Sequence, residues 1–167
     1  MPEQALPLDS VICATYHNAD FADSHWVAVN PLPDSALAAF VQMVQQTPAW
    51  VNAMMSLRNR VVKLLGLKDL GALGNLEQQK PLADYQVGER LGIFTIVSIA
   101  QNELVLSDVD KHLRVQLAVQ RIATAERRAI AITTVVHQHN WLGRVYMLFV
   151  GPMHKLIAPA TLAKLGQ

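Results

Sequence analysis

Apolar and polar side chains alternate from Lys111 to Arg121 more regularly than anywhere else in the chain. Successive side chains of a β-strand point to opposite faces of its sheet, so this alternation predicts a strand with one apolar and one polar face. The apolar positions are Leu113, Val115, Leu117 and Val119, and the polar ones are His112, Arg114, Gln116 and Gln120. The apolar face needs burial against another element of the fold.

Strand patterns flank this segment on both sides. The predicted neighbours are Ile93 to Ile99, Leu104 to Leu106 and Ala129 to His137, with turns at Gln101-Asn102, at Asp108–Asp110 and from Thr124 to Arg127. Consecutive strands joined by short connections become antiparallel neighbours, so we expect a four-stranded antiparallel meander. Two earlier β-prone runs, Val11 to Tyr16 and His25 to Val29, predict short N-terminal strands.

Two helices are expected between the N-terminal strands and the meander. Asp34 and Ser35 are good residues to begin the first helix, which has a single apolar stripe. Thr47 is the predicted N-cap of the second helix, with Pro48 at its first position and Gly66 at its end. Residues 66–90 are predicted to form a long loop with one helical turn, because glycine recurs throughout them.

The last element is a long helix that begins after Asn140, a favourable N-cap residue. Its predicted apolar face consists of Leu142, Val145, Tyr146, Phe149, Met153, Leu156 and Ile157. Pro152 lacks the N–H group that would bond to the carbonyl of Leu148, so we expect a kink between these two residues.

Together these elements predict one α+β domain over residues 1–167 with a helix-grip arrangement. Short N-terminal strands and two helices would precede an antiparallel meander that wraps the kinked C-terminal helix. Apolar residues make up 51% of the chain and charged residues only 16%, which indicates a large core. The same pattern is compatible with a solid core and with a cavity under the last helix.

Charge and motif content exclude several classes of function. A net charge of +1 with scattered basic residues argues against nucleic-acid binding. The single cysteine, Cys13, excludes an internal disulfide and a cysteine-pair metal site. No secretory signal is recognisable, and Arg144, Pro152 and Lys155 interrupt the most apolar stretch, so no transmembrane segment is expected. We therefore expect a cytoplasmic, bacterial-type protein without a cofactor.

Two sets of residues are candidates for a ligand-binding site. The first set is polar, lies where the sheet meets the last helix, and consists of Asp108, Asp110, His112, Arg114, His137, His139, Asn140 and Arg144. These residues could anchor a ligand or an anion, or could simply be solvated strand ends and cap residues. Convergence of enough ligands for a metal ion is not indicated. The second set is large and apolar and consists of Trp26, Trp50, Met54, Met55, Tyr146, Phe149 and Met153. Such residues line pockets well, and at helical spacing they also form ordinary cores.

Several segments resemble the bacterial family known as domain of unknown function 2867, and the resemblance spans nearly the whole chain. The segments are Asp20–Asp23, Pro48–Val51, Leu57–Arg60, Gly88–Phe94, Asp110–Leu113, His139–Tyr146 and Pro152–His154. The resemblance implies a fold of the START/Bet v 1 superfamily, also called SRPBCC, whose members often bind apolar small molecules. It implies no catalytic residues. The family also occurs fused behind short-chain-dehydrogenase-like domains, and this chain contains no such domain.

The sequence therefore favours a protein that binds an apolar or amphipathic small molecule between the sheet and the last helix. One alternative is an interaction module that docks on a dehydrogenase-like subunit through an exposed helix face, and a homodimer is also compatible with the composition. Another is a small hydrolase or isomerase that uses scattered histidines. No nucleophile-elbow, phosphate-loop or zinc-protease motif is present, so catalysis is the less favoured reading.

Overall fold

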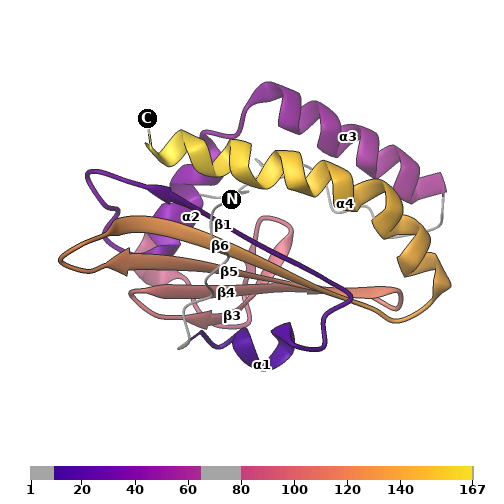
Figure 1. Cartoon of the computed structure of the whole chain (residues 1–167), viewed down its shortest axis with the longest axis horizontal. Coiled ribbons are helices and arrows are strands. Elements are labelled where there is room, and N and C mark those ends of the chain that lie inside the picture. Colours follow the sequence, from indigo (N-terminus) through magenta and orange to yellow (C-terminus); the bar gives the residue numbers. More distant parts are fainter. Residues whose placement is uncertain (1–9, 65–79, 167) are drawn as a thin grey trace.

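A six-stranded sheet forms the centre of the fold, with three helices on one face and a short helix on the other (Figure 1). The computed structural model describes residues 10–64 and 80–166. Helices α2, α3 and α4 lie on the upper face of the sheet in Figure 1, and α1 lies on the lower face. The protein is therefore α+β, as the sequence predicted.

All strand pairs of the sheet are antiparallel, and the strand order is β1-β6-β5-β4-β3-β2. The strands are β1 (Phe21–Ala28), β2 (Arg90–Leu91), β3 (Phe94–Ile99), β4 (Glu103–Val109), β5 (Leu113–Ala123) and β6 (Arg128–Gln138). Strands β3 to β6 confirm the predicted meander. Strand β1 joins its open edge beside β6, with Phe21 opposite Val136 and Ala28 opposite Ala129.

The segment from Val11 to Tyr16 is not a strand, contrary to the prediction. It contains α1 (Cys13–Tyr16), which covers the second face of the sheet. Ile12 is buried there against Ala118 and Val135, where the small alanine side chain leaves room for it. Gln116 and Gln120, on the same face of β5 as Ala118, are also buried. Ile12 is thus used for packing across the sheet rather than for pairing at its edge.

The two predicted helices are α2 (Ala36–Gln45) and α3 (Ala49–Leu64). Ser35 caps α2 as expected, because its hydroxyl accepts a hydrogen bond from the Ala38 N–H at 3.0 Å. The Thr47 hydroxyl donates to the Met43 carbonyl of α2 at 3.3 Å, and its role as the cap of α3 stays a prediction. The apolar face of α2 packs on the sheet and contributes more residues to the main core cluster than any other element does.

The predicted loop 66–90 falls largely outside the described residues. Its described part contains the predicted helical turn, η1 (Leu82–Asp84), and ends in β2. Gly88 and Gly92 have φ angles of 92° and 60°, which other residues rarely adopt, and they flank β2. Their backbone conformation lets the chain reverse twice within a few residues and enter the edge of the sheet.

Helix α4 (Trp141–Leu162) continues into the short η2 (Ala163–Gly166) and lies across the sheet. The Asn140 side chain caps it by accepting the Gly143 N–H at 3.2 Å, as predicted. The helix also bends between its orange first part and its yellow later part in Figure 1, consistent with the proline at position 152.

The buried face of α4 differs from the predicted one. It runs through small residues and Tyr146, and consists of Gly143, Tyr146, Gly151, Ala158, Thr161 and Leu162. Phe149 and Leu156, predicted to be buried, are 60% and 61% exposed. The reason is that small side chains permit a closer approach to the sheet than the large ones do, so the stripe of largest residues lies beside the contact and partly faces solvent.

We expect Gly143→Ala to lower the free energy of unfolding by about 1–3 kcal/mol, the range for an overpacked site. A Cβ atom at this position would lie 2.4 Å from the backbone carbonyl oxygen of His112, so α4 would have to move away from the sheet. Urea denaturation followed by circular dichroism measures the change.

The matched control is Gly151→Ala in the same helix. An added Cβ there meets only the Met147 Cε at 4.0 Å, an ordinary contact. Because alanine favours helix by about 1 kcal/mol over glycine, this variant should be neutral or more stable. Equal losses in the two variants would contradict the close contact at Gly143.

Candidate functional site

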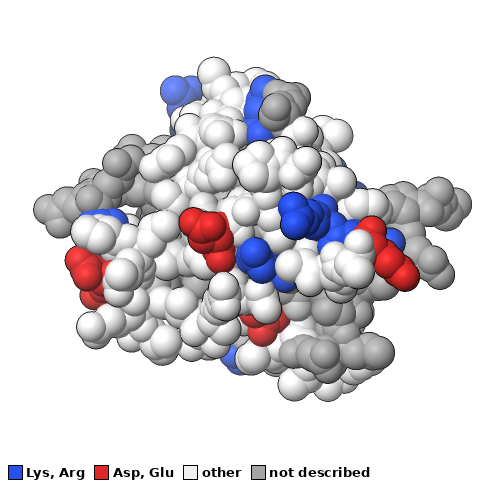
Figure 2. All heavy atoms as spheres, turned by 90° about the vertical axis from the view of Figure 1, so that its left-hand side faces the viewer, with Lys and Arg blue, Asp and Glu red and all other residues white. Residues whose placement is uncertain are grey.

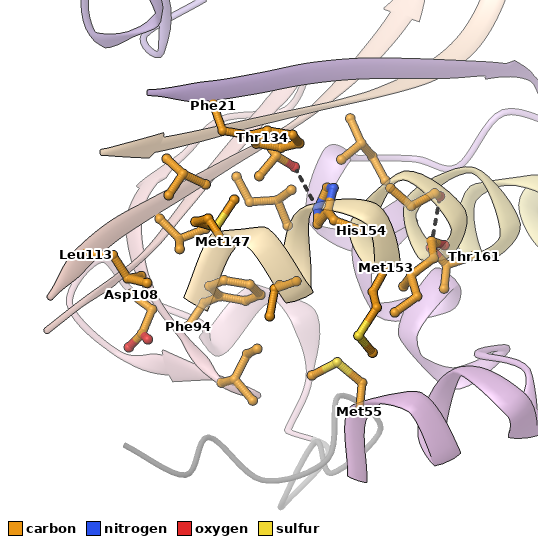
Figure 3. A pocket seen from close by; sticks show the side chains of 18 of the residues that line it. Phe21, Met55, Phe94, Asp108, Leu113, Thr134, Met147, Met153, His154 and Thr161 are labelled. Atoms are coloured by element: carbon orange, nitrogen blue, oxygen red, sulfur yellow. Dashed lines mark hydrogen bonds between the residues drawn. The ribbon is translucent and has the colours of Figure 1, made fainter. Parts of the chain in front are cut away.

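A cavity of about 170 Å³ lies between the sheet and α4. The side chains around it come from β1, β3, β4, β5 and β6 on one side and from α2, α3 and α4 on the other (Figure 3). Most of them are apolar. The polar ones among the described residues are Thr47, Asp108, Asp110, Thr134, His154 and Thr161, together with Tyr146, whose ring carries a hydroxyl group. Protein cores hold few voids larger than a water molecule, and a dry cavity of comparable volume can hold a small aromatic ring.

The predicted apolar residues divide between the cavity and the surface. Met55, Tyr146 and Met153 line the cavity. Trp26, Trp50 and Phe149 are exposed, and Met54 is half-buried outside the lining. Four methionines take part in the lining, namely Met43, Met55, Met147 and Met153. Their flexible side chains can adapt to ligands of different shape.

The predicted polar residues gather where α4 begins, outside the cavity. The Asn140 side chain lies within hydrogen-bonding distance of His112 Nδ1 and donates to the Lys111 carbonyl at 3.1 Å. The N–H of His139 donates to the His112 carbonyl at 2.8 Å. Arg114 is exposed and pairs in register with His137 on β6.

Arg144 is also exposed. Asp108 and Asp110 are the exceptions, because they line the cavity, whereas the other six predicted polar residues do not. The described contacts of His112 and His139 thus attach α4 to the turn between β4 and β5. Among the described residues, no group of three or more metal-ligating side chains is placed to hold a metal ion.

A chain of hydrogen bonds crosses the wall of the cavity from β1 to α4 and β6. Asp23 Oδ2 lies 3.1 Å from His154 Nδ1, and His154 Nε2 lies 3.2 Å from the Thr134 hydroxyl (Figure 3). His25 Nε2 also approaches Asp23 Oδ2, at 3.3 Å. Strand pairing sets Asp23 opposite Thr134, so both side chains lie on the face that α4 covers. His154 and Thr134 line the cavity, and Asp23 lies behind them.

The electrostatics of this array favour an ionised Asp23. Burial raises the pKa of its carboxyl group, but the hydrogen bonds and charges of His154 and His25 together outweigh burial, so the pKa lies below its ordinary value. An ionised Asp23 accepts the Nδ1–H of His154. In the neutral ring, Nε2 is then left as the acceptor for the Thr134 hydroxyl. Asp23 Oδ1 is buried and has no hydrogen-bond partner among the described residues.

Sequence reasoning assigned no role to Asp23, Thr134 or His154. His154 carries the one signal that could have been used, because it falls at helical spacing on the stripe of small buried residues in α4. An ionisable residue on such a stripe points into the fold. Asp23 and Thr134 could not be joined to it without the register of β1 against β6.

Comparison with known proteins places the chain in one family. The family model described as "Protein of unknown function (DUF2867)" matches residues 15–161, so the chain belongs to that family, as the resemblance predicted. The match includes Asp23, Thr134 and His154. No curated protein and no solved structure matches the chain.

The ionised Asp23 should contribute stability that acid removes. Because its folded pKa lies below the ordinary value of 3.8, the contribution is complete above that value and is lost as the pH falls through the folded pKa. Asp23→Asn removes the titrating group. We expect its free energy of unfolding to fall less steeply than that of the wild type between about pH 5 and pH 2.

Urea titrations at several pH values measure both slopes. Asp84→Asn, at an exposed carboxylate in η1, is the matched control and should keep the wild-type slope. An unchanged slope in Asp23→Asn would show that the array does not hold the carboxylate ionised.

Proposed function

We propose that this member of the DUF2867 family binds an apolar or amphipathic small molecule in the cavity beneath α4. The observation that carries the proposal is the cavity itself, about 170 Å³ lined mostly by apolar side chains. A ligand that fills this space removes apolar surface from water, which is favourable by about 25 cal/mol per Å² of buried apolar area.

The lining defines the chemistry of the expected ligand. Phe21, Met147 and Val150 offer apolar contacts, while Thr134 and His154 present hydrogen-bonding groups at one place in the wall. A ligand with an apolar body and one hydroxyl or carbonyl group satisfies both. Few polar groups at defined positions in an apolar pocket are typical of small-molecule sites.

The arrangement also supports assignment to a helix-grip fold of the START/Bet v 1 type, which we include in the proposal. Support comes from the antiparallel sheet and from the long C-terminal helix that lies across it with a cavity between them. Members of that superfamily often bind apolar small molecules, which agrees with the proposed function.

Filling the cavity should abolish ligand binding. Val150→Trp places a larger side chain in the lining, and we expect it to weaken binding of the neutral dye N-phenyl-naphthylamine at least tenfold, about 1.4 kcal/mol or more. Fluorescence titration measures the affinity. Native mass spectrometry after incubation with a cell extract detects natural ligands.

Leu148→Trp is the matched control, since Leu148 lies two residues away on α4 and is 73% exposed. It should bind the dye like the wild type. If the wild-type protein retains neither the dye nor any mass from the extract, the proposed function is wrong.

A second candidate function rests on the outer face of α4. Trp141, Leu148, Phe149 and Leu156 are all exposed and recur at helical spacing. With η2, the helix is long and apolar enough to cross a membrane by length and composition alone, which is weak support because a core helix can pass the same test. The stripe is more apolar than a solvated helix face requires.

Charge around this stripe favours one kind of partner. Neither α3 nor α4 contains an acidic residue, while Arg60, Lys63, Arg144 and Lys155 are exposed on them. On the side of the molecule shown in Figure 2, the upper part carries blue atoms and no red ones, and Figure 1 places α3 and α4 there. Apolar and aromatic side chains flanked by cations fit an anionic bilayer surface. We therefore propose an anionic bilayer surface, rather than a dehydrogenase-like subunit, as the partner of this helix face.

Vesicle sedimentation tests this second candidate. Wild-type protein should sediment with phosphatidylglycerol vesicles and not with phosphatidylcholine vesicles. Leu148→Glu should remain in solution, because it loses an apolar contact of about 1.5–3 kcal/mol and places a negative charge at the surface.

Val109→Glu is the matched control. Val109 is 55% exposed on β4, and its variant should sediment like the wild type. Failure of the wild type to bind either vesicle would refute the candidate. A dimer that Leu148→Glu dissociates would assign the face to a second copy of the chain.

A further inference from the structure

We propose that His154, oriented by Asp23, is a general base that moves a proton on a neutral carbonyl compound bound in the cavity. This inference rests on the proposed function, because it requires that a small molecule occupies the space beneath α4. It adds a chemical activity and a substrate class to that site.

The geometry is that of a base with its orienting group. Asp23 Oδ2 fixes one ring nitrogen of His154 at 3.1 Å, and the other nitrogen faces the Thr134 hydroxyl at 3.2 Å. Figure 3 shows His154 reaching from α4 toward Thr134 among the apolar lining residues. A general base must lie within hydrogen-bond reach of the proton that it takes. His154 meets this condition for a ligand in the cavity, whose wall it shares with Thr134.

If Asp23, His154 and Thr134 had only a structural role, burying them would lower the stability of the fold. Asp23 has a side chain only 8% exposed, and its Oδ1 is buried without a described partner. An unsatisfied buried polar atom costs about 1–3 kcal/mol, and apolar residues of similar volume would fill the same space without this cost. Buried ionisable groups next to a cavity are more typical of functional sites than of cores.

Acyl transfer with Thr134 as nucleophile fits the structure less well. Thr134 lies inside β6, between partners on β1 and β5. The backbone N–H groups of a strand paired on both sides are used in the sheet ladders. They are therefore not free to converge on the oxyanion of an acyl intermediate, which such chemistry needs. Proton transfer needs only the base and one hydrogen-bond donor.

The step can be written without a co-reactant. The Thr134 hydroxyl, whose proton can rotate, first turns from His154 Nε2 to the carbonyl oxygen of the ligand, which frees the lone pair of Nε2. That lone pair then takes a proton from the carbon next to the carbonyl group. The C–H bond breaks, its electron pair forms the C=C bond of an enolate, and the carbonyl π pair moves to the oxygen that the Thr134 hydroxyl donates to. Nε2–H then returns the proton to the same carbon or to a conjugated one, which gives exchange or isomerisation.

Charge and lining define the substrate class. The Asp23 carboxylate behind His154 disfavours an anionic ligand, as does Asp110 elsewhere in the lining. The apolar lining favours a compact ketone with an activated C–H bond next to its carbonyl group.

Deuterium exchange of β-tetralone, a neutral ketone with a benzylic C–H bond next to the carbonyl, tests the inference. Proton NMR in D2O measures exchange at that carbon, and saturation-transfer NMR on the same samples measures binding. We expect the wild-type protein to accelerate exchange at least about hundredfold over an equal concentration of imidazole, the lower end of general-base catalysis. His154→Gln should reduce the rate to that of imidazole.

Three further variants separate catalysis from folding. Asp23→Asn should bind β-tetralone as the wild type does but exchange it at least about tenfold more slowly, because an amide does not select the same ring tautomer. Thr134→Val should also keep binding and lose rate. His139→Gln, at an exposed histidine outside the cavity, should match the wild type in both measurements.

The outcomes distinguish this inference from the proposed function. Binding of β-tetralone without accelerated exchange would overturn the catalytic inference and leave ligand binding intact. Exchange that survives His154→Gln would also overturn it. If β-tetralone does not bind while N-phenyl-naphthylamine does, the substrate class inferred here is wrong. If neither binds, the proposed function fails together with the inference.

Discussion

The attachment of α4 at both of its ends determines the rest of the structure. At its start, the backbone of Gly143 lies against the His112 carbonyl so closely that a Cβ atom would be 2.4 Å from that oxygen. At its far end, an added Cβ at Gly166 in η2 would meet Val27 at 3.0 Å and the Ala28 carbonyl at 3.1 Å. A helix held this closely at two distant points of a twisted sheet cannot follow the sheet between them. The bend in α4 and the cavity lie in that middle part.

The buried face of α4 consists mainly of small residues, whereas several of its large apolar residues are exposed. Gly143, Gly151 and Ala158 occupy buried positions where a globular helix more often has leucine or phenylalanine. Gly143 brings α4 into close contact with the His112 carbonyl, and the larger side chains of the helix are left at its flanks and outer surface. Leu148 and Phe149 are therefore exposed because small side chains, rather than these large ones, face the sheet. The cations beside these residues, Arg144 and Lys155, make the same surface suited to an anionic partner.

Local patterns predicted the elements, whereas the site depended on how the elements meet. The alternation in β5 and the caps at Ser35 and Asn140 are set within a few residues, and the structure confirms them. The strand predicted around Ile12 was wrong, because Ile12 packs across the face of the sheet instead of pairing at its edge. The predicted polar residues were chosen by their nearness to the start of α4, and they attach the helix there.

The hydrogen-bonded array could not be found from local patterns, because Asp23 lies more than a hundred residues before Thr134 and His154 in the sequence. Asp23 and Thr134 become neighbours only through the register of β1 on β6, and His154 reaches them only because the inner stripe of α4 is made of small residues.

The apolar surroundings of the array strengthen it and also limit what it can bind. Hydrogen bonds and charges act more strongly in the low dielectric of a protein interior. The Asp23 side chain is only 8% exposed, so it fixes the ring of His154 more firmly than an exposed carboxylate would. The same low dielectric makes an unpaired charge expensive. A ligand that brought its own negative charge next to Asp23 would bear this cost, because no lysine or arginine is among the described residues that line the cavity. A neutral ligand with one hydrogen-bonding group avoids the cost and fills the void, so the preference for neutral molecules follows from the fold before any chemistry takes place.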